Sequence, residues 1–142
     1  MNRLRQWYFP LGFAITIGLI LAAITLFVQI YIARFEYGDG LAPGIIMQFW
    51  IVAGSFLLGA ISAFTSARYH VISSVLIAVG IYGWTLLISW SAMVDSAQSP
   101  GAGLTPTLFD LIIGPFWFLL LIIGLIVGGI EYGIRHLLNS QL

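Results

Sequence analysis

Charged residues divide this chain into four long apolar stretches. None of the four contains Lys, Arg, Asp or Glu. Each extends for about 20 residues or more, the length that an α-helix needs to cross the hydrocarbon core of a bilayer. The pattern predicts an all-α integral membrane protein with four transmembrane helices. The charged residues that bound the stretches are Arg5 and Arg34, Asp39 and Arg68, Arg68 and Asp95, and Asp110 and Glu131.

The predicted helices use most of the chain, so the loops between them must be short. Composition supports this prediction, because 61% of the residues are hydrophobic and 7% are charged, whereas a soluble domain carries about 25% charged residues. Residues 1–142 are therefore expected to form a single four-helix transmembrane domain. Its helices are expected at about 8–33, 44–67, 71–94 and 106–132.

The arginines are distributed unequally over the predicted loops and termini. Most of them fall on one side of the membrane, and by the positive-inside rule this side is cytoplasmic. That side carries Arg3, Arg5, Arg68 and Arg135, and the other carries Arg34. The sequence therefore predicts a multi-pass protein of the plasma (cytoplasmic) membrane with both termini cytoplasmic, N-in and C-in.

A cleaved signal peptide over residues 1–23 is the alternative interpretation of the first stretch. A basic end precedes an apolar core there, and Ala22-Ala23 supplies small residues for a cut. The apolar run continues to Ala33, however, which is longer than a usual signal core. A first transmembrane helix is therefore the favoured interpretation.

Small and weakly polar residues recur along each predicted helix at alternating spacings of three and four. Lipid provides no hydrophobic drive between helices, so residues that allow close approach and shared hydrogen bonds favour packing. A period of about 3.5 keeps each stripe facing its neighbours and predicts a left-handed bundle with crossing angles of about +20°. The alternative is that small residues are simply common in transmembrane helices. The stripes are Gly18, Ala22, Thr25 and Gln29; Ser55, Gly59, Ser62 and Ser66, with Gln48 before them; Ser74, Ala78, Thr85, Ser89 and Ala92; and Gly114, Leu121, Gly124 and Gly128.

Two glutamines differ from the other stripe residues because each carries a full amide within a predicted span. Gln29 and Gln48 fall near the outer ends of the first and second helices, at similar depth. A buried amide without a partner costs a few kcal/mol. We therefore expect the two amides to pair with each other or with a serine, and a substrate contact is the alternative.

The last predicted helix has no polar side chain in its middle but contains two glycine pairs. Gly124-x-x-x-Gly128 and Gly129-x-x-x-Gly133 have a spacing that permits close helix approach. These glycines are expected to pack against another subunit or within the chain. Pro115 should bend the helix in its first turns, because proline lacks the backbone N–H that the helix uses.

The segments before the second and fourth helices share the pattern Gly-x-Gly-Leu-x-Pro, over 38–43 and 101–106. Proline suits the first turn of a helix, and glycine gives the preceding loop conformational freedom. One interpretation is duplication of a helical hairpin, with the halves related by a pseudo-twofold axis along the membrane normal. The other is that two short loops converged. Thr105 is the expected N-cap of the fourth helix, with Asp110 near its positive end.

Residues capable of chemistry are few. Cysteine is absent, and the two histidines, His70 and His136, fall at the cytoplasmic edge without a serine motif. Glu131 and His136 are poorly spaced for a shared metal ion, whereas Glu131 and Arg135 have the helical spacing of an interfacial ion pair. A proton- or ion-coupling role for Glu131 is the alternative. No catalytic, cofactor, metal or nucleic-acid site is expected, and the chain is not expected to be an enzyme.

These patterns favour a non-catalytic membrane protein that acts as a structural, accessory or assembly subunit. Its expected partners are the lipid bilayer and either further copies of itself or the subunits of a membrane complex. A small homo-oligomeric channel or transporter is the alternative, and a membrane enzyme acting on lipid comes third. The candidate packing residues are Gln29, Gln48, Ser55, Gly59, Ser62, Gly124 and Gly128. The polar seam of a channel would comprise Thr16, Thr25, Gln29, Ser55, Ser62 and Ser66.

Overall fold

The computed structural model describes residues 2–32, 41–98 and 107–140, and within these ranges it contains helices and no strand. The helical class predicted from the sequence is thus confirmed for the described residues. In chain order the elements are α1 (Asn2–Phe27), the π-helical turn η1 (Val28–Ile32), α2 (Leu41–Tyr69), α3 (Ser73–Gln98), α4 (Leu108–Ile113) and α5 (Trp117–Ser140).

Four of the described helices are long and apolar enough to cross a membrane. They agree in number with the four spans predicted from the sequence. The first three lie within a few residues of the predicted positions, whereas the fourth lies further along the chain than the predicted 106–132. α5 continues to Ser140 because no proline follows Gly133 to end it. The segments that qualify as spans are Trp7–Ile30, Ile45–Tyr69, Ser73–Asp95 and Trp117–Ser140.

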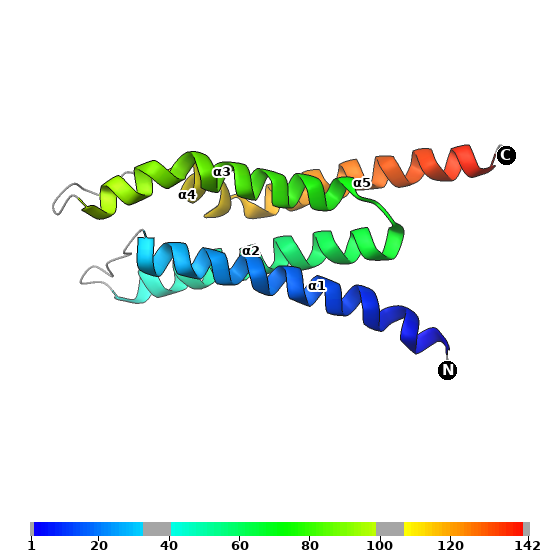
Figure 1. Ribbon diagram of the computed structural model, residues 1–142, viewed down its shortest axis with the longest axis horizontal. Helices are drawn as coiled ribbons and strands as arrows, with labels where there is room; N and C mark the ends of the chain where they lie inside the picture. Colours follow the sequence, from blue (N-terminus) through cyan, green and yellow to red (C-terminus); the bar gives the residue numbers. More distant parts are fainter. Residues whose placement is uncertain (1, 33–40, 99–106, 141–142) are drawn as a thin grey trace.

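The helices are arranged in two layers (Figure 1). α1 lies along α2 in one layer, and α3 lies beside α4 and α5 in the other, while α2 also contacts α3 and α5. The start of α1, the α2–α3 turn and the end of α5 lie at one end of the molecule. We call this the arginine end, after Arg68 and Arg135. The opposite end, which carries Asp95 and Asp110, is the aspartate end.

A tight turn joins α2 to α3. His70 directly follows α2 and has a φ of 54°, the left-handed conformation that commonly follows the end of a helix. Two residues later, the carbonyl of Ile72 accepts a hydrogen bond from the N–H of Leu76 at 3.1 Å, in the first turn of α3. The turn is therefore short and sends α3 back along α2.

The fourth predicted helix is broken, which corrects the expected continuous helix with a bend. α4 ends at Ile113 and α5 begins at Trp117, with residues 114–116 between them. Pro115 cannot donate a backbone hydrogen bond, and its ring would collide with the carbonyl of the preceding turn. The break therefore makes α4 a short helix at the aspartate end, separate from α5, which is long and apolar enough to span a membrane.

α4 begins with a capping box. Thr107 Oγ1 accepts a hydrogen bond from the N–H of Asp110 at 3.3 Å, and Asp110 Oδ2 accepts one from the N–H of Thr107 at 3.1 Å. The expected N-cap, Thr105, lies outside the described residues, and the cap of the described helix is Thr107. The repeated loop segments over 38–40 and 101–106 also lie outside the described residues, so the duplication stays a prediction.

Apolar side chains fill the space between the two layers and also cover the outside of the helices. Exposed Leu, Ile and Phe side chains extend along α1, α2, α3 and α5. A helix that is apolar on all sides suits a membrane better than water. The buried core cluster consists of Leu21, Val28, Ile51, Leu58, Ala78, Tyr82, Met93, Phe109, Ile113 and Leu120.

Candidate functional site

Three side-chain hydroxyls meet between α1, α2 and α3. Thr25 Oγ1 lies 2.9 Å from Ser55 Oγ and 2.7 Å from the hydroxyl oxygen of Tyr82. The exposed fraction of the residue is 0% for Thr25 and Ser55 and 2% for Tyr82. We call these three residues the hydroxyl cluster. They connect three helices through polar contacts inside an apolar core.

Each proton of the hydroxyl cluster has an acceptor. The distances accommodate a chain in which Tyr82 donates to Thr25, Thr25 donates to Ser55, and Ser55 donates to the carbonyl of Ile51 at 3.0 Å. The carbonyl of Leu21 lies 2.9 Å from Thr25 Oγ1 and 3.2 Å from the Tyr82 hydroxyl and offers a further acceptor. Such interhelical bonds are worth about 0.6 kcal/mol each in membranes. The three hydroxyls therefore have no proton left over for a ligand.

Glycines set the distance between α1 and α2. A Cβ atom added to Gly18 would lie 2.8 Å from the backbone oxygen of Phe56, and one added to Gly59 would lie 3.1 Å from the backbone oxygen of Ile17. At Gly18 a side chain would require the backbones to shift, and at Gly59 it would require them to move apart by a few tenths of an ångström. Ser55 and Gly59 thus both face α1, one through a hydrogen bond and the other through backbone contact.

The other buried hydroxyls do not form a continuous seam with the cluster, and Ser74 Oγ is buried without a hydrogen-bond partner among the described residues. Ser62 is buried, and Ser89 Oγ accepts a hydrogen bond from the N–H of Phe109 at 3.0 Å, which ties α3 to α4. Thr16 is exposed and bonds to its own helix, so it does not join the seam expected for a channel. Thr16 and Thr25 are nine residues apart, about two and a half turns, and therefore point in opposite directions.

The amide oxygen of Gln29 lacks the partner expected for it. Gln29 lies in η1 with 3% of its surface exposed, and its Oε1 is buried without a hydrogen-bond partner in the described part of the chain. Gln48 is half-buried on α2. Similar depth does not give the Gln29 oxygen a partner, because depth does not fix the direction of a side chain. The change from α to π geometry at Val28 also shifts the helical phase of Gln29.

The glycines of α5 divide between two faces. A Cβ at Gly124 would lie 3.4 Å from the backbone oxygen of Ser74, and one at Gly128 would lie 3.2 Å from Val71 Cγ1. The first glycine pair therefore packs within the chain, against the start of α3. For the second pair, which begins at Gly129, an added Cβ would meet nothing within 4 Å at either position.

Glu131 and Arg135 of α5 hold the α2–α3 turn. Arg135 Nη2 lies 2.6 Å from Glu131 Oε1, which is the ion pair that their spacing suggests, and Nη1 donates to the carbonyl of His70 at 2.9 Å. Glu131 Oε2 accepts from the N–H of Ser73 at 3.1 Å and from its hydroxyl at 2.6 Å. Because Ser73 begins α3, the carboxylate binds at the positive end of that helix. We call His70, Ser73, Glu131 and Arg135 the clamp.

Sequence reasoning missed Tyr82 and Ser73 as hydrogen-bonding residues. Tyr82 lies four residues after Ala78 and three before Thr85, so it occupies the gap in the stripe of the third helix. That spacing was sufficient to identify it. Ser73 offered no such signal, because 58 positions separate it from Glu131 and only the path of the turn brings the two together.

The two histidines at the arginine end have different contact partners. The ring of His136 lies 6.3 Å from the ring of Tyr132 between centroids, and His70 contributes its carbonyl to the clamp. Within the ranges that the structure describes, no group of three His, Cys, Asp or Glu side chains is placed to hold a metal ion.

The fold supports one statement about the class of protein. The four apolar helices are compatible with a multi-pass membrane protein. No protein-family model, no curated protein and no solved structure matches the chain.

Proposed function

We propose that this protein is a non-catalytic membrane subunit that packs against other transmembrane helices in a structural, accessory or assembly role. The observation that carries the proposal is that the polar side chains of these two sites, the hydroxyl cluster and the clamp, bond to groups of the same chain. They hold the chain's own helices together. The faces that the described helices present outward are mostly apolar.

The outward face of α5 supports this role. Ile122, Ile126 and Ile130 follow one another at a spacing of four and are each about half exposed. The second glycine pair beside them leaves the helix backbone open to close approach. In a membrane, van der Waals packing against such a face is what holds a second helix. The proposed partner is a transmembrane helix of another subunit or of a second copy.

Gentle extraction tests the subunit role. Native mass spectrometry of the tagged protein, extracted with a mild detergent from its own membrane, should show a complex of fixed stoichiometry that contains a further transmembrane chain. The same sample in a harsh detergent should show the mass of the single chain and serves as the control. A protein that is a lone monomer in every mild detergent would contradict the proposal.

A small homo-oligomeric channel or transporter is the second candidate, and Gln29 is the observation that favours it. Its amide oxygen is buried without a partner, and it lies in a π-helical turn, a feature frequent at functional sites. Solute flux in liposomes by the pure protein, abolished by Gln29→Leu and retained by Thr16→Val, would replace the subunit role with transport. Thr16 is the matched control because it faces outward on α1, the helix that directly precedes η1.

A further inference from the structure

A groove opens between the start of α3 and the second half of α5 at the arginine end. It has a volume of about 400 Å³. Ser73 supplies its α3 side, and the other lining residues belong to α5. Both charged side chains of the clamp are among them, so we call it the clamp groove. The lining residues are Ser73, Val127, Ile130, Glu131, Ile134 and Arg135.

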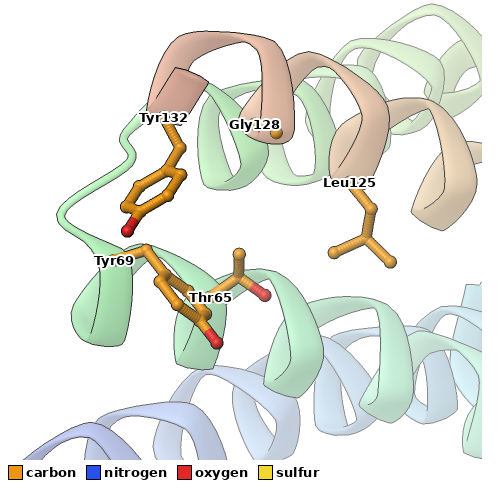
Figure 2. Close-up of a pocket in the computed structure, with 6 residues that line it drawn as sticks. Thr65, Tyr69, Leu125, Gly128 and Tyr132 are labelled. Carbon is orange, nitrogen blue, oxygen red and sulfur yellow. The ribbon is translucent and has the colours of Figure 1, made fainter. Parts of the chain in front are cut away.

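A second groove lies on the side of α5 that faces α2 (Figure 2). It has a volume of about 190 Å³, and side chains of α2 and α5 face each other across it. We call it the tyrosine groove. Its lining residues carry no charge, so they do not select an ionic group, and this groove serves below as a control. They are Thr65, Tyr69, Leu125, Gly128, Gly129 and Tyr132.

The apolar wall of the clamp groove follows α5. Val127 and Ile134 are seven residues apart, about two helical turns, and therefore lie on the same side of the helix as Glu131. Ile130 and Ile134 are each about half exposed. Ile130 borders the outward face that we propose for the partner helix, whereas Val127 and Glu131 lie towards Ser73 of α3. A hydrocarbon chain suits this wall.

Arg135 has spare hydrogen-bond donors in the groove. A guanidinium carries five N–H groups. One of them faces Glu131 Oε1, with Nη2 at 2.6 Å, and one faces the carbonyl of His70, with Nη1 at 2.9 Å. Two of the five are thus used and three remain, on a side chain that is partly exposed. Because its two contacts fix the guanidinium in place, the spare N–H groups are suited to a phosphate, which accepts parallel hydrogen bonds.

Glu131 has one spare acceptor position in the same groove. A carboxylate accepts about four hydrogen bonds, and Glu131 receives two from Ser73 and one from Arg135. The lining holds one positive and one negative charge and is neutral overall. A ligand that carries both signs keeps the site neutral, whereas an anionic ligand adds a charge that no lining residue compensates.

We propose that the clamp groove binds one phosphatidylethanolamine molecule. Its phosphate accepts from Arg135, its primary ammonium donates to Glu131, and an acyl chain lies along Val127. Charge complementarity selects this occupant. The quaternary ammonium of phosphatidylcholine has no N–H to donate, phosphatidylglycerol brings only a negative charge, and an apolar helix leaves the spare N–H groups of Arg135 without acceptors. The site requires that the protein lies in a membrane, but it does not depend on the subunit role.

Lipid retention by the unaltered protein tests the site first. The full-length protein is placed in nanodiscs of equal phosphatidylethanolamine, phosphatidylcholine and phosphatidylglycerol, transferred to a mild detergent that removes bulk lipid, and weighed by native mass spectrometry. It should retain one phosphatidylethanolamine in preference to either other lipid. Equal retention of phosphatidylethanolamine and phosphatidylcholine, or a preference for phosphatidylglycerol, would overturn the proposal.

Two variants test the headgroup contacts. Arg135→Gln should lower phosphatidylethanolamine retention by about tenfold, the factor expected when hydrogen bonds to a charged group are lost. Glu131→Gln leaves the charge of Arg135 uncompensated and should switch the preference to phosphatidylglycerol. A groove that merely lost its shape would release all three lipids alike, so the switch reports on charge. An unchanged preference for phosphatidylethanolamine in Glu131→Gln would contradict the assignment.

Gly129→Leu is the control in the tyrosine groove. An added Cβ meets nothing within 4 Å at this position, so the leucine fills that groove and leaves the clamp groove intact. Phosphatidylethanolamine retention should equal that of the wild type, and a loss as large as in Arg135→Gln would place the lipid in the tyrosine groove and overturn the proposal. A protein that is monomeric in every mild detergent yet retains phosphatidylethanolamine would support this site while contradicting the subunit role.

Discussion

Replacing Gly59 with leucine is expected to destabilise the folded protein by about 1–3 kcal/mol, the usual cost of overpacking a close contact. The Cβ alone would lie 3.1 Å from the Gly18 Cα and from the backbone oxygen of Ile17. Backbone atoms cannot rotate away as a flexible side chain can, so α1 has to move away from α2. This movement would also separate Thr25 from Ser55 in the hydroxyl cluster.

Gly80→Leu is the matched control for this substitution. It makes the same chemical change in another long apolar helix, at a position where an added Cβ meets nothing within 4 Å. It should be no less stable than the wild type, because leucine favours a helix more than glycine does. The measurement is an SDS titration from mild-detergent micelles, followed by circular dichroism. Equal unfolding midpoints for the two variants would show that Gly59 does not set the α1–α2 distance.

Removing the carboxylate of Glu131 is expected to loosen the α2–α3 turn. Glu131→Ala takes the acceptor away from the N–H and hydroxyl of Ser73 and leaves the Arg135 guanidinium without its acid. Amide hydrogen exchange at Ser73 should therefore accelerate by about tenfold or more, the factor expected when a hydrogen bond to a charged group is lost. Exchange in the middle of α3, near Tyr82, should change much less.

Two further variants separate the helix-end contact from the ion pair. Arg135→Gln removes the exposed partner, whose side chain is 52% exposed, and exposed ion pairs contribute little. It should therefore affect exchange at Ser73 less than Glu131→Ala does. Glu131→Gln keeps an acceptor oxygen and should fall between them. If Arg135→Gln had the larger effect, the clamp would act mainly through the ion pair, and the assignment of Glu131 to the end of α3 would be wrong.

The four long apolar helices were predictable because they depend on composition along the chain. The first three apolar stretches reappear as helices of spanning length, whereas the fourth helix, Trp117–Ser140, begins inside its stretch and continues past Glu131 and Arg135. The break at Pro115 was only partly predictable. A proline in the first turns of a helix is compatible with a bend as well as a break, and the chain separates at residues 114–116 because the capping box of Thr107 and Asp110 lets α4 stand as a short helix of its own.

Contacts between helices were less predictable than the helices themselves. Spacing placed Thr25, Ser55 and Gly59 on the packing faces of their helices, but it did not show which neighbouring helix each residue faces. The amide oxygen of Gln29 therefore lacks its expected partner, since the depth of a residue does not determine the direction of its side chain. The partner of Glu131 was hidden because Ser73 becomes its neighbour only through the turn after His70.

Cysteine labelling tests most directly whether the chain crosses the membrane four times with the arginine end in the cytoplasm. The chain contains no cysteine, so an introduced one is unique. Ile72 and Ser140 lie at the arginine end and Gln98 lies at the end of α3. In intact cells we expect an impermeant thiol reagent to label Gln98→Cys and to spare Ile72→Cys and Ser140→Cys until the cells are opened. Labelling of Ile72→Cys and Gln98→Cys from the same side, or of Ile72→Cys and Ser140→Cys from opposite sides, would contradict the four-span arrangement.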